Sequence, residues 1–389
     1  MMQRVYLDYS ATTPLDPRVL DAMRPFFTEG FGNASSIHAF GREARVALEE
    51  RREVVAKFLN ADVGEIFFTS GGTESDNHAI KGVAFASKQK GKTHLITSRA
   101  EHHAVLHTCK FLEKLGFEVT YLPVGEYGRV DPDDVRRSIT DRTCLISIMH
   151  ANNEIGTLNP IEEIGRVARE HGVLFHSDTV QSFGKIPLDV RTLAVDLLSV
   201  SGHKIYGPKG IGALYIRKGV AIENILHGGG QERGRRAGTE NVPLAVGLAR
   251  AVEICKEEMD KEMKRLGELR NLLKDKLEQG FNGLIINTHP VHSLANILSI
   301  SFDSRRAEID GEVLLLSLDL KGVAVSNGSA CTSGSLEPSH VLLAMGRDER
   351  TAGASLRFSL GRGSTESDIE YAVTALGEVV DRHRSVMSR

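Results

Sequence analysis

Short runs of β-branched and aromatic residues alternate with amphipathic helical segments along the first half of the chain, and this alternation restricts the fold more than any other feature. The predicted strands are EIFFTS (65–70), THLITS (93–98), EVTYLPV (118–124), CLISIM (144–149), VLFHSD (173–178), LLSVS (197–201) and GALYIR (212–217). Few of these runs alternate strictly between apolar and polar residues, as expected for strands buried on both faces. The pattern predicts an α/β fold with a mainly parallel seven-stranded sheet covered by helices.

A second, smaller unit is predicted in the last third of the chain. Residues 242–280 have a helical pattern almost throughout, which is longer than one helix of a globular domain usually runs. Four further strands are predicted at 283–288, 297–302, 323–328 and 355–361. A chain of 389 residues exceeds the roughly 250–300 residues at which a single core stops growing. We therefore expect a large domain over residues 15–260 and a small α+β domain formed by residues 1–14 and 261–389.

Composition and charge exclude several classes of protein. The net charge is −3 and the longest basic stretch is ERGRR at 232–236, so no nucleic-acid surface is expected. No apolar run approaches the ~18–20 residues that span a bilayer, and the N-terminus lacks the layout of a secretory signal. The four cysteines form no C-x-x-C pair, which argues against a disulfide framework or a zinc site. We expect a cytoplasmic protein that acts on small molecules or proteins.

Polar residues follow several of the predicted strands, where open α/β sheets bind their ligands. Ser70-Gly71-Gly72-Thr73 follows the first strand and precedes a helix, and free amides at a helix start suit a phosphate. A plain tight turn with Thr73 as helix cap explains this stretch equally well. Asp178 ends the strand 173–178, and a carboxylate there needs a cation, such as a pyridinium nitrogen. A local cap or turn is at least as common for a lone aspartate.

Two residues have the chemistry of nucleophiles. Lys204 follows the strand 197–201, and because burial lowers the pKa of a lysine, its neutral amine could form a Schiff base. Lys209, in the GPKG turn, is an alternative candidate for the same role, but a lysine in such a turn is typically exposed to solvent. Cys331 lies in the Gly/Ser-rich stretch 326–335, where an exposed thiol is a candidate nucleophile. A phosphate-binding turn, an acid and a lysine at the ends of one sheet's strands are together what a pyridoxal-phosphate site needs.

Ten ordered stretches resemble the NifS/IscS cysteine desulfurases, pyridoxal-phosphate enzymes of the class V aminotransferase group and fold type I. They are YLDYSATTP (6–14), GNASSIH (32–38), FTSGGTESDN (68–77), EHHAVL (101–106), NNEIGT (152–157), HSDTVQSFGK (176–185), SGHKIYGPKGIG (201–212), GGGQERGRRAGTEN (228–241), GSACTSGSLEPSHVL (328–342) and LRFSLGR (356–362). The resemblance covers essentially the whole chain. It implies the large cofactor-binding domain and the small domain of that fold.

The resemblance also implies the roles of individual residues. The cofactor would be bound by Gly72, Thr73, His102, Asn153, Asp178, Gln181, Ser201, His203, Lys204 and Thr239. Lys204 would hold the cofactor and move the proton at the substrate Cα, Asp178 would pair with the pyridine nitrogen, and His102 would stack on the ring. Gln181 and Asn153 would lie near the phenolic oxygen, and Gly72, Thr73, Ser201 and His203 near the phosphate. Thr239 would reach the phosphate of a neighbouring subunit, which implies a homodimer.

The implied reaction converts L-cysteine to L-alanine. Arg357 would bind the substrate carboxylate, with Asn33 and Asn153 assisting, and Cys331 would take the sulfur as a persulfide. The sulfur would pass to an iron–sulfur scaffold or another acceptor. No resident metal is expected, although Cys331 could ligate a cluster during transfer. A selenocysteine lyase, another enzyme of the group and a non-catalytic assembly protein are the alternatives, and the combination of Lys204, Asp178, His102, Arg357 and Cys331 argues against the last.

Overall fold

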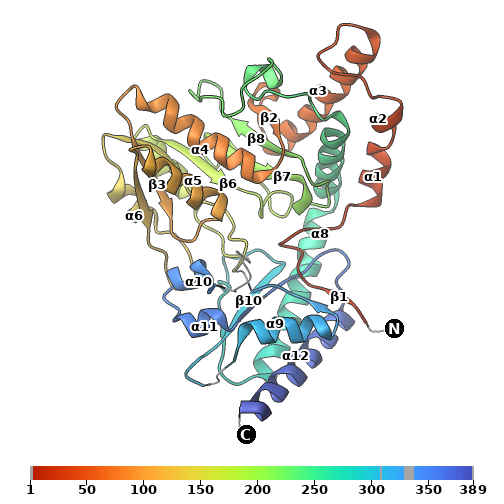
Figure 1. Cartoon of the computed structure of the whole chain (residues 1–389), viewed down its shortest axis with the longest axis vertical. Helices are drawn as coiled ribbons and strands as arrows, with labels where there is room; N and C mark the ends of the chain where they lie inside the picture. The colour runs from red at the N-terminus through yellow and green to blue at the C-terminus, as the bar shows by residue number, and fades with distance from the viewer. Residues whose placement is uncertain (1–2, 307–308, 328–336, 388–389) are drawn as a thin grey trace.

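The computed structural model describes residues 3–306, 309–327 and 337–387, and its larger unit is built on a seven-stranded sheet (Figure 1). The strands are β2 (Ile66–Thr69), β3 (His94–Ser98), β4 (Glu118–Leu122), β5 (Thr143–Ser147), β6 (Leu174–Asp178), β7 (Leu197–Ser201) and β8 (Gly212–Ile216). Their order is β2-β8-β7-β6-β5-β3-β4. β8 runs antiparallel to β2 and β7, and the other neighbouring pairs are parallel. The predicted mainly parallel seven-stranded sheet is confirmed.

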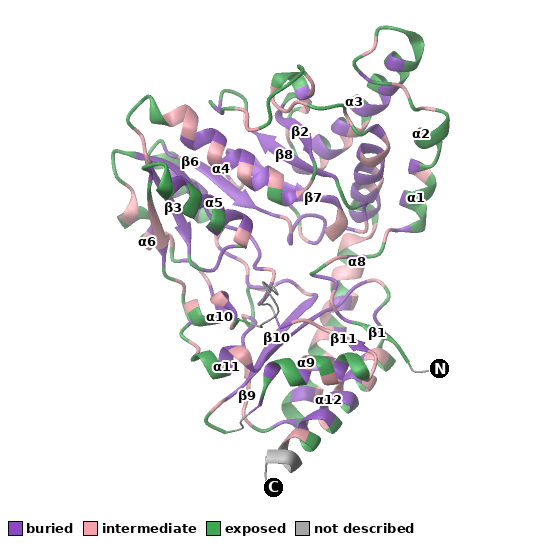
Figure 2. Cartoon of the chain, in the orientation of Figure 1, coloured by how far each residue is buried: buried purple, intermediate pink, exposed green. Residues whose placement is uncertain are grey.

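Both faces of this sheet are buried, which explains the near-continuous apolar runs of its strands. Adjacent residues of one strand belong to different hydrophobic clusters: Phe67 packs with the cluster on one face and Phe68 with the cluster on the other, and Leu197 and Leu198 are divided in the same way. Since successive side chains of a strand point to opposite faces, each cluster fills one side of the sheet. The buried strands and the exposed outer surfaces of the helices are visible in Figure 2.

Helices cover the sheet on both sides. They are α1 (Pro17–Met23), α2 (Pro25–Thr28), α3 (Ala39–Leu59), α4 (Gly72–Lys88), α5 (His103–Lys114), α6 (Pro132–Ser138), α7 (Ile161–Glu170) and α8 (Val242–Gly280). Buried residues of α4 and α5 pack on one face, and those of α3, α7 and α8 on the other. Local sequence fixes several starts: Asp16 and Asp131 cap α1 and α6 through their side chains, each followed by a proline in the first turn.

The smaller unit contains a three-stranded antiparallel sheet of order β12-β10-β9 and a two-stranded parallel one. Its elements are β1 (Val5–Tyr6), β9 (Leu284–Ile286), β10 (Ile297–Phe302), β11 (Val323–Ala324), β12 (Ser355–Ser359), α9 (Gly311–Leu320), α10 (His340–Ala344), α11 (Glu349–Gly353) and α12 (Glu366–Met387). All four strands expected here are present, although the one expected at 323–328 is a two-residue strand. β1 was not predicted, because two residues carry no periodic signal.

The helix α8 joins the two units, as Figure 1 shows. Its residues from Val242 to Cys255 pack in the core of the larger unit, whereas Leu266 to Leu277 pack in a separate core with Val5 and Leu7. We propose on this basis that the domains divide near residue 260, and that residues 1–14 belong with residues 261–389. Among the helices within the described ranges, none is long and apolar enough to cross a membrane.

Candidate active site

A cavity of about 330 Å³ lies at the carboxyl ends of the central strands, next to the smaller unit. It is lined by Ser10, Ala11, Gly72, Thr73, Asp76, His102, Met149, Asn153, Asp178, Val180, Gln181, Ser201, His203, Lys204 and Arg357. Ten of these residues were named from the sequence as cofactor or substrate ligands. The topology brings them together because parallel strands end at the same edge of the sheet.

The turn between β2 and α4 forms one wall of the cavity. Gly71 has a φ of 152°, a conformation that other residues rarely adopt, and α4 begins at Gly72. A Cβ atom at Gly72 would lie 2.6 Å from Cγ2 of Val180, so only glycine fits there without movement. Thr73 is therefore not the helix cap that the alternative interpretation required. The first amides of α4 have no partner within the helix and are suited to bind an anion such as a phosphate.

Lys204 lies in a 3₁₀ turn, Gly202–Lys204, directly after β7. Its Nζ donates hydrogen bonds to the carbonyl oxygens of Ser10 at 2.6 Å and Ala11 at 2.7 Å. Burial, followed by the positive charge of Arg357, lowers the pKa of the lysine to about 8. A useful fraction of the amine is therefore neutral near pH 7.5, as a nucleophile requires. Lys209, the rival candidate, is exposed and does not line the cavity.

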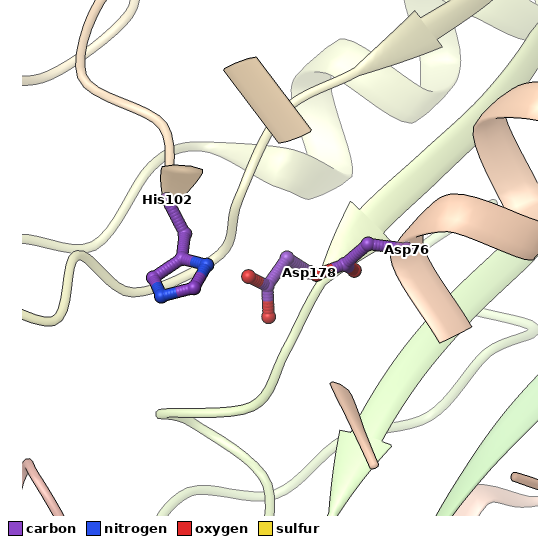
Figure 3. Close-up of side chains that lie close together, drawn as sticks. All are labelled: Asp76, His102 and Asp178. Carbon is purple, nitrogen blue, oxygen red and sulfur yellow. The ribbon is translucent and has the colours of Figure 1, made fainter. Parts of the chain in front are cut away.

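Asp178, at the end of β6, lies between Asp76 and the ring of His102 in Figure 3. One oxygen of each carboxylate and one ring nitrogen lie within 4.8 Å of one another. Burial raises the pKa of Asp178 to about 6, while the Val180 amide, 2.9 Å from its Oδ1, and the charge of Lys204 lower it. Burial, and then repulsion by Asp178, raise the pKa of Asp76 well above its usual range. We infer that Asp76 holds a proton while Asp178 can be an anion.

His102 caps α5 and is held as a neutral ring. Its Nδ1 accepts a hydrogen bond from the Ala104 amide at 3.1 Å, so the ring proton is on Nε2. Burial, and then the charge of Lys204, lower its pKa to about 4. The two carboxylates and His102 could in geometry hold a metal ion, but the ammonium of Lys204 nearby disfavours a second cation.

Arg357, on β12, is the cation that faces the cavity from the smaller unit. Its Nη1 donates to the carbonyl oxygen of Asn153 at 2.8 Å and its Nη2 to Oδ1 of Asp8 at 2.7 Å. Its Nε is buried and has no hydrogen-bond partner among the described residues. A buried guanidinium with unused donors is suited to bind a carboxylate in two contacts.

Two of the residues named from the sequence do not line this cavity within one chain. Asn33 and Thr239 are exposed, in the loops before α3 and before α8. Cys331 lies outside the described residues. The described residues on either side of residues 328–336 are near the cavity: Ser326 pairs with the backbone of Arg357, and the hydroxyl of Ser339 donates to Glu154.

The N-terminal residues of the site were not assigned any role from the sequence. Asp8 pairs with Arg357, and the carbonyl of Ser10 accepts hydrogen bonds from Lys204 and from Gln181. Thr12 contacts Nδ1 of His203 through its hydroxyl, at 3.1 Å. The only sequence signal was that the stretch 6–14 matched the family pattern. Its partners are distant in the chain, so periodicity and spacing could not reveal them.

The residues present fit pyridoxal phosphate. Asp178, a buried carboxylate that lines the cavity beside the protonated Asp76, can accept a pyridinium nitrogen, and the close approach at Gly72 leaves backbone amides for a phosphate. Lys204 supplies an amine of lowered pKa beside them. The fold and this site define a pyridoxal-phosphate enzyme of the α/β type.

Comparison with known proteins agrees with this class. Residues 5–372 match the family described as Aminotransferase class-V, and the chain belongs to this family. Cysteine desulfurase IscS of Dictyoglomus turgidum is 54% identical, over 99% of this chain and 97% of its own length. Cysteine desulfurase IscS of Methanosarcina thermophila is 53% identical, over 98% and 93%.

Solved structures of similar proteins have the same fold as this chain. A NifS-like protein superimposes with a TM-score of 0.91 at 43% identity, covering 98% of this chain and all of its own. The structure titled SspA in complex with cysteine has a TM-score of 0.80 at 41% identity, covering 92% and 98%. Enzymes of this family use pyridoxal phosphate, and the fold predicted from the sequence is confirmed.

Proposed function

We propose that this chain is a pyridoxal-phosphate-dependent cysteine desulfurase that converts L-cysteine to L-alanine and transfers the sulfur to Cys331. The observation that supports it best is the meeting of Lys204, Asp178 and Arg357 in one cavity, in a chain whose full-length relatives are named cysteine desulfurases. A transaminase or a docking platform has no need of a cysteine at position 331. No observation favours selenocysteine as the substrate.

Each part of the cavity would hold one part of the cofactor. Gly72, Thr73, Ser201 and His203 would bind the phosphate, Asp178 the ring nitrogen and His102 the ring face, and Gln181 and Asn153 would lie near the phenolic oxygen. When bound, the cofactor withdraws electrons from the substrate Cα. Asp178 can supply the negative charge that keeps the ring nitrogen protonated. Because Asp76 beside it is neutral, no second carboxylate repels this charge.

The chain's own groups bind the substrate and move its protons. Arg357 would bind the α-carboxylate through its planar donors, and this contact would orient the substrate Cα relative to Lys204, which lines the same cavity. Lys204, whose pKa is about 8, would accept the Cα proton and return it. The neutral ring of His102, with its proton on Nε2, can donate a hydrogen bond to a group in the cavity.

Sulfur transfer is assigned to Cys331. Its thiolate would attack the substrate sulfur, a sulfur–sulfur bond would form, and the carbon–sulfur bond would break with its electron pair left on carbon. Protonation of that carbon completes alanine. The described residues Ser326 and Ser339, on either side of the segment with Cys331, contact Arg357 and Glu154, which favours delivery of the thiol to this cavity.

We also propose that the active form is a homodimer. Five large apolar side chains in or near α2 and α3 are exposed by more than half: Phe27, Phe31, Ile37, Phe40 and Val46. Apolar surface of this kind marks an interface with another protein. A second copy would also give Thr239 and Asn33 a route to the cavity across the interface. Sedimentation or light scattering of the purified protein should give about twice the mass of one chain.

The sulfur acceptor is proposed to be an iron–sulfur scaffold or another sulfur carrier, reached in the cytoplasm. Free, buried thiols at Cys109, Cys144 and Cys255 suit a reducing compartment. No ligand role is proposed for them, because burial raises the pKa of each thiol.

The proposal is tested with purified protein, L-cysteine and a reductant. The parent protein should absorb visible light, and should release sulfide and alanine in equal amounts. Cys331→Ser should keep the colour and lose sulfide release, whereas Lys204→Ala should lose both. A colourless parent, or a Cys331→Ser variant that releases sulfide at the parent rate, would contradict the proposal.

A further inference from the structure

Lys185 is a buried lysine that no step above uses. It lies in the turn after β6 and is only 7% exposed. Its Nζ donates a hydrogen bond to Oε1 of Gln181 at 3.1 Å, and among the residues that the structure describes no carboxylate forms an ion pair with it. Burying an ammonium group without a counterion is unfavourable, so the amide contact needs an explanation beyond stability.

The contact continues into the cavity. Gln181 lines the cavity and is itself buried. Its Nε2 donates to the carbonyl oxygen of Ser10 at 2.9 Å, and the same oxygen accepts from Lys204 Nζ at 2.6 Å. A continuous path of hydrogen bonds therefore runs from Lys185 through Gln181 to the oxygen that holds Lys204.

The ammonium group of Lys185 and the carbonyl oxygen of Ser10 together allow only one orientation of the Gln181 amide. An ammonium group can only donate, so Oε1 must face Lys185, and a carbonyl oxygen can only accept, so Nε2 must face Ser10. The NH₂ group has two hydrogens and uses one of them for Ser10. The other is available to an acceptor in the cavity. Without Lys185, Oε1 would be a buried acceptor without a partner, and the opposite orientation would gain population.

We propose that Lys185 is a positioning residue that fixes the side-chain amide of Gln181, so that its NH₂ group donates to the phenolic oxygen of the bound cofactor. This inference rests on the proposed function. Burial lowers the pKa of Lys185 to about 7, and both the charged and the neutral amine keep N–H groups that can donate. The charged amine enforces this orientation most strictly, because a neutral amine can also accept a hydrogen bond.

The test is the pH titration of the visible absorption band of the purified protein with its cofactor. A donor to the phenolic oxygen favours its anionic form, so loss of that donor raises the pH at which the chromophore releases its proton. One hydrogen bond changes an equilibrium by roughly two- to tenfold, so Lys185→Met should raise the midpoint by roughly 0.3 to 1 pH unit. Lys185→Arg, which keeps donors at this position, should move the midpoint less. Lys218→Met, at an exposed turn, is the matched control and should not move it.

Protein that carries Gln181→Leu distinguishes an effect of Lys185 through the Gln181 amide from a direct effect of the Lys185 charge on the chromophore. If Lys185 acts through the amide, Lys185→Met should cause no further shift in protein that carries Gln181→Leu. A shift of the same size in both backgrounds would overturn the proposal, as would a Lys185→Met midpoint equal to that of the parent. If the methionine variant does not fold, Lys185→Ala has the same expectation. A parent protein without any visible band would instead contradict the proposed function.

Discussion

The buried ion pair between Arg52 and Glu232 gives the sharpest stability prediction. Arg52 Nη1 and Nη2 donate to Oε2 and Oε1 of Glu232 at 2.6 and 2.9 Å, and both side chains are almost fully buried. Oε2 also accepts from the Phe68 amide on β2 at 2.8 Å. Glu232 and Arg233 both have positive φ angles, so the pair holds a strained loop against the strand that leads to Gly72.

Glu232→Gln keeps the shape and removes the charge. Leaving a buried guanidinium without its anion costs about 3–5 kcal/mol. Glu49, 38% exposed and 3.2 Å from Arg52 Nε, offsets part of this, so we expect the lower end, about 3 kcal/mol. That corresponds to a fall of roughly 1 M in the urea midpoint. Arg52→Met with Glu232→Gln should be more stable than Glu232→Gln alone, because no unpaired charge is then buried.

The measurement is urea unfolding followed by circular dichroism, since the chain has no tryptophan. Cofactor concentration is the same in every sample, because a ligand of the folded state adds to its stability. Glu170→Gln is the control: its ion pair with Arg136 has the same chemistry but is exposed, and it should cost less than about 1 kcal/mol. A loss below 1 kcal/mol for Glu232→Gln, or strictly additive losses in the double variant, would refute the reasoning.

Three further predictions concern the active site. Gly72→Ala should weaken cofactor retention on dialysis by about tenfold or more, because its Cβ would lie 2.6 Å from Val180, whereas Gly377→Ala, in an open part of α12, should not. Arg357→Lys should raise KM for L-cysteine on the order of tenfold with a smaller change in kcat, since the planar donors are lost; an unchanged KM would contradict the assignment. Burial raises the pKa of Glu154 from 4.5 to about 7. Between these two pH values the folded protein keeps a proton on Glu154 that the unfolded chain has lost. The free energy of unfolding therefore falls as the pH rises through this range. Glu154→Gln should flatten this dependence in urea unfolding at pH 5 and pH 8.5, and an unaltered slope would show that Glu154 is not its source.

Local patterns predicted most of the fold. The seven strands of the large sheet were found to within three residues at each end, and residues 242–280, whose pattern is helical almost throughout, form one helix although they are longer than a helix of a globular domain usually is. Asp178 shows why a single residue could not be assigned from local sequence alone. Its Oδ1 accepts from the Val180 amide, as in the local turn considered as an alternative, yet the same carboxylate lines the cavity.

The sequence by itself determined the elements, because hydrophobic periodicity, strand ends and helix caps are interactions between near neighbours in the chain. It also placed Lys204, Asp178 and Gly72 at the ends of strands. Only the tertiary structure decided which charges meet. Asp8 pairs with Arg357 across 349 residues, and the carbonyl of Ser10 joins Gln181 to Lys204. Such contacts depend on how the two units pack, and no spacing within the chain encodes them.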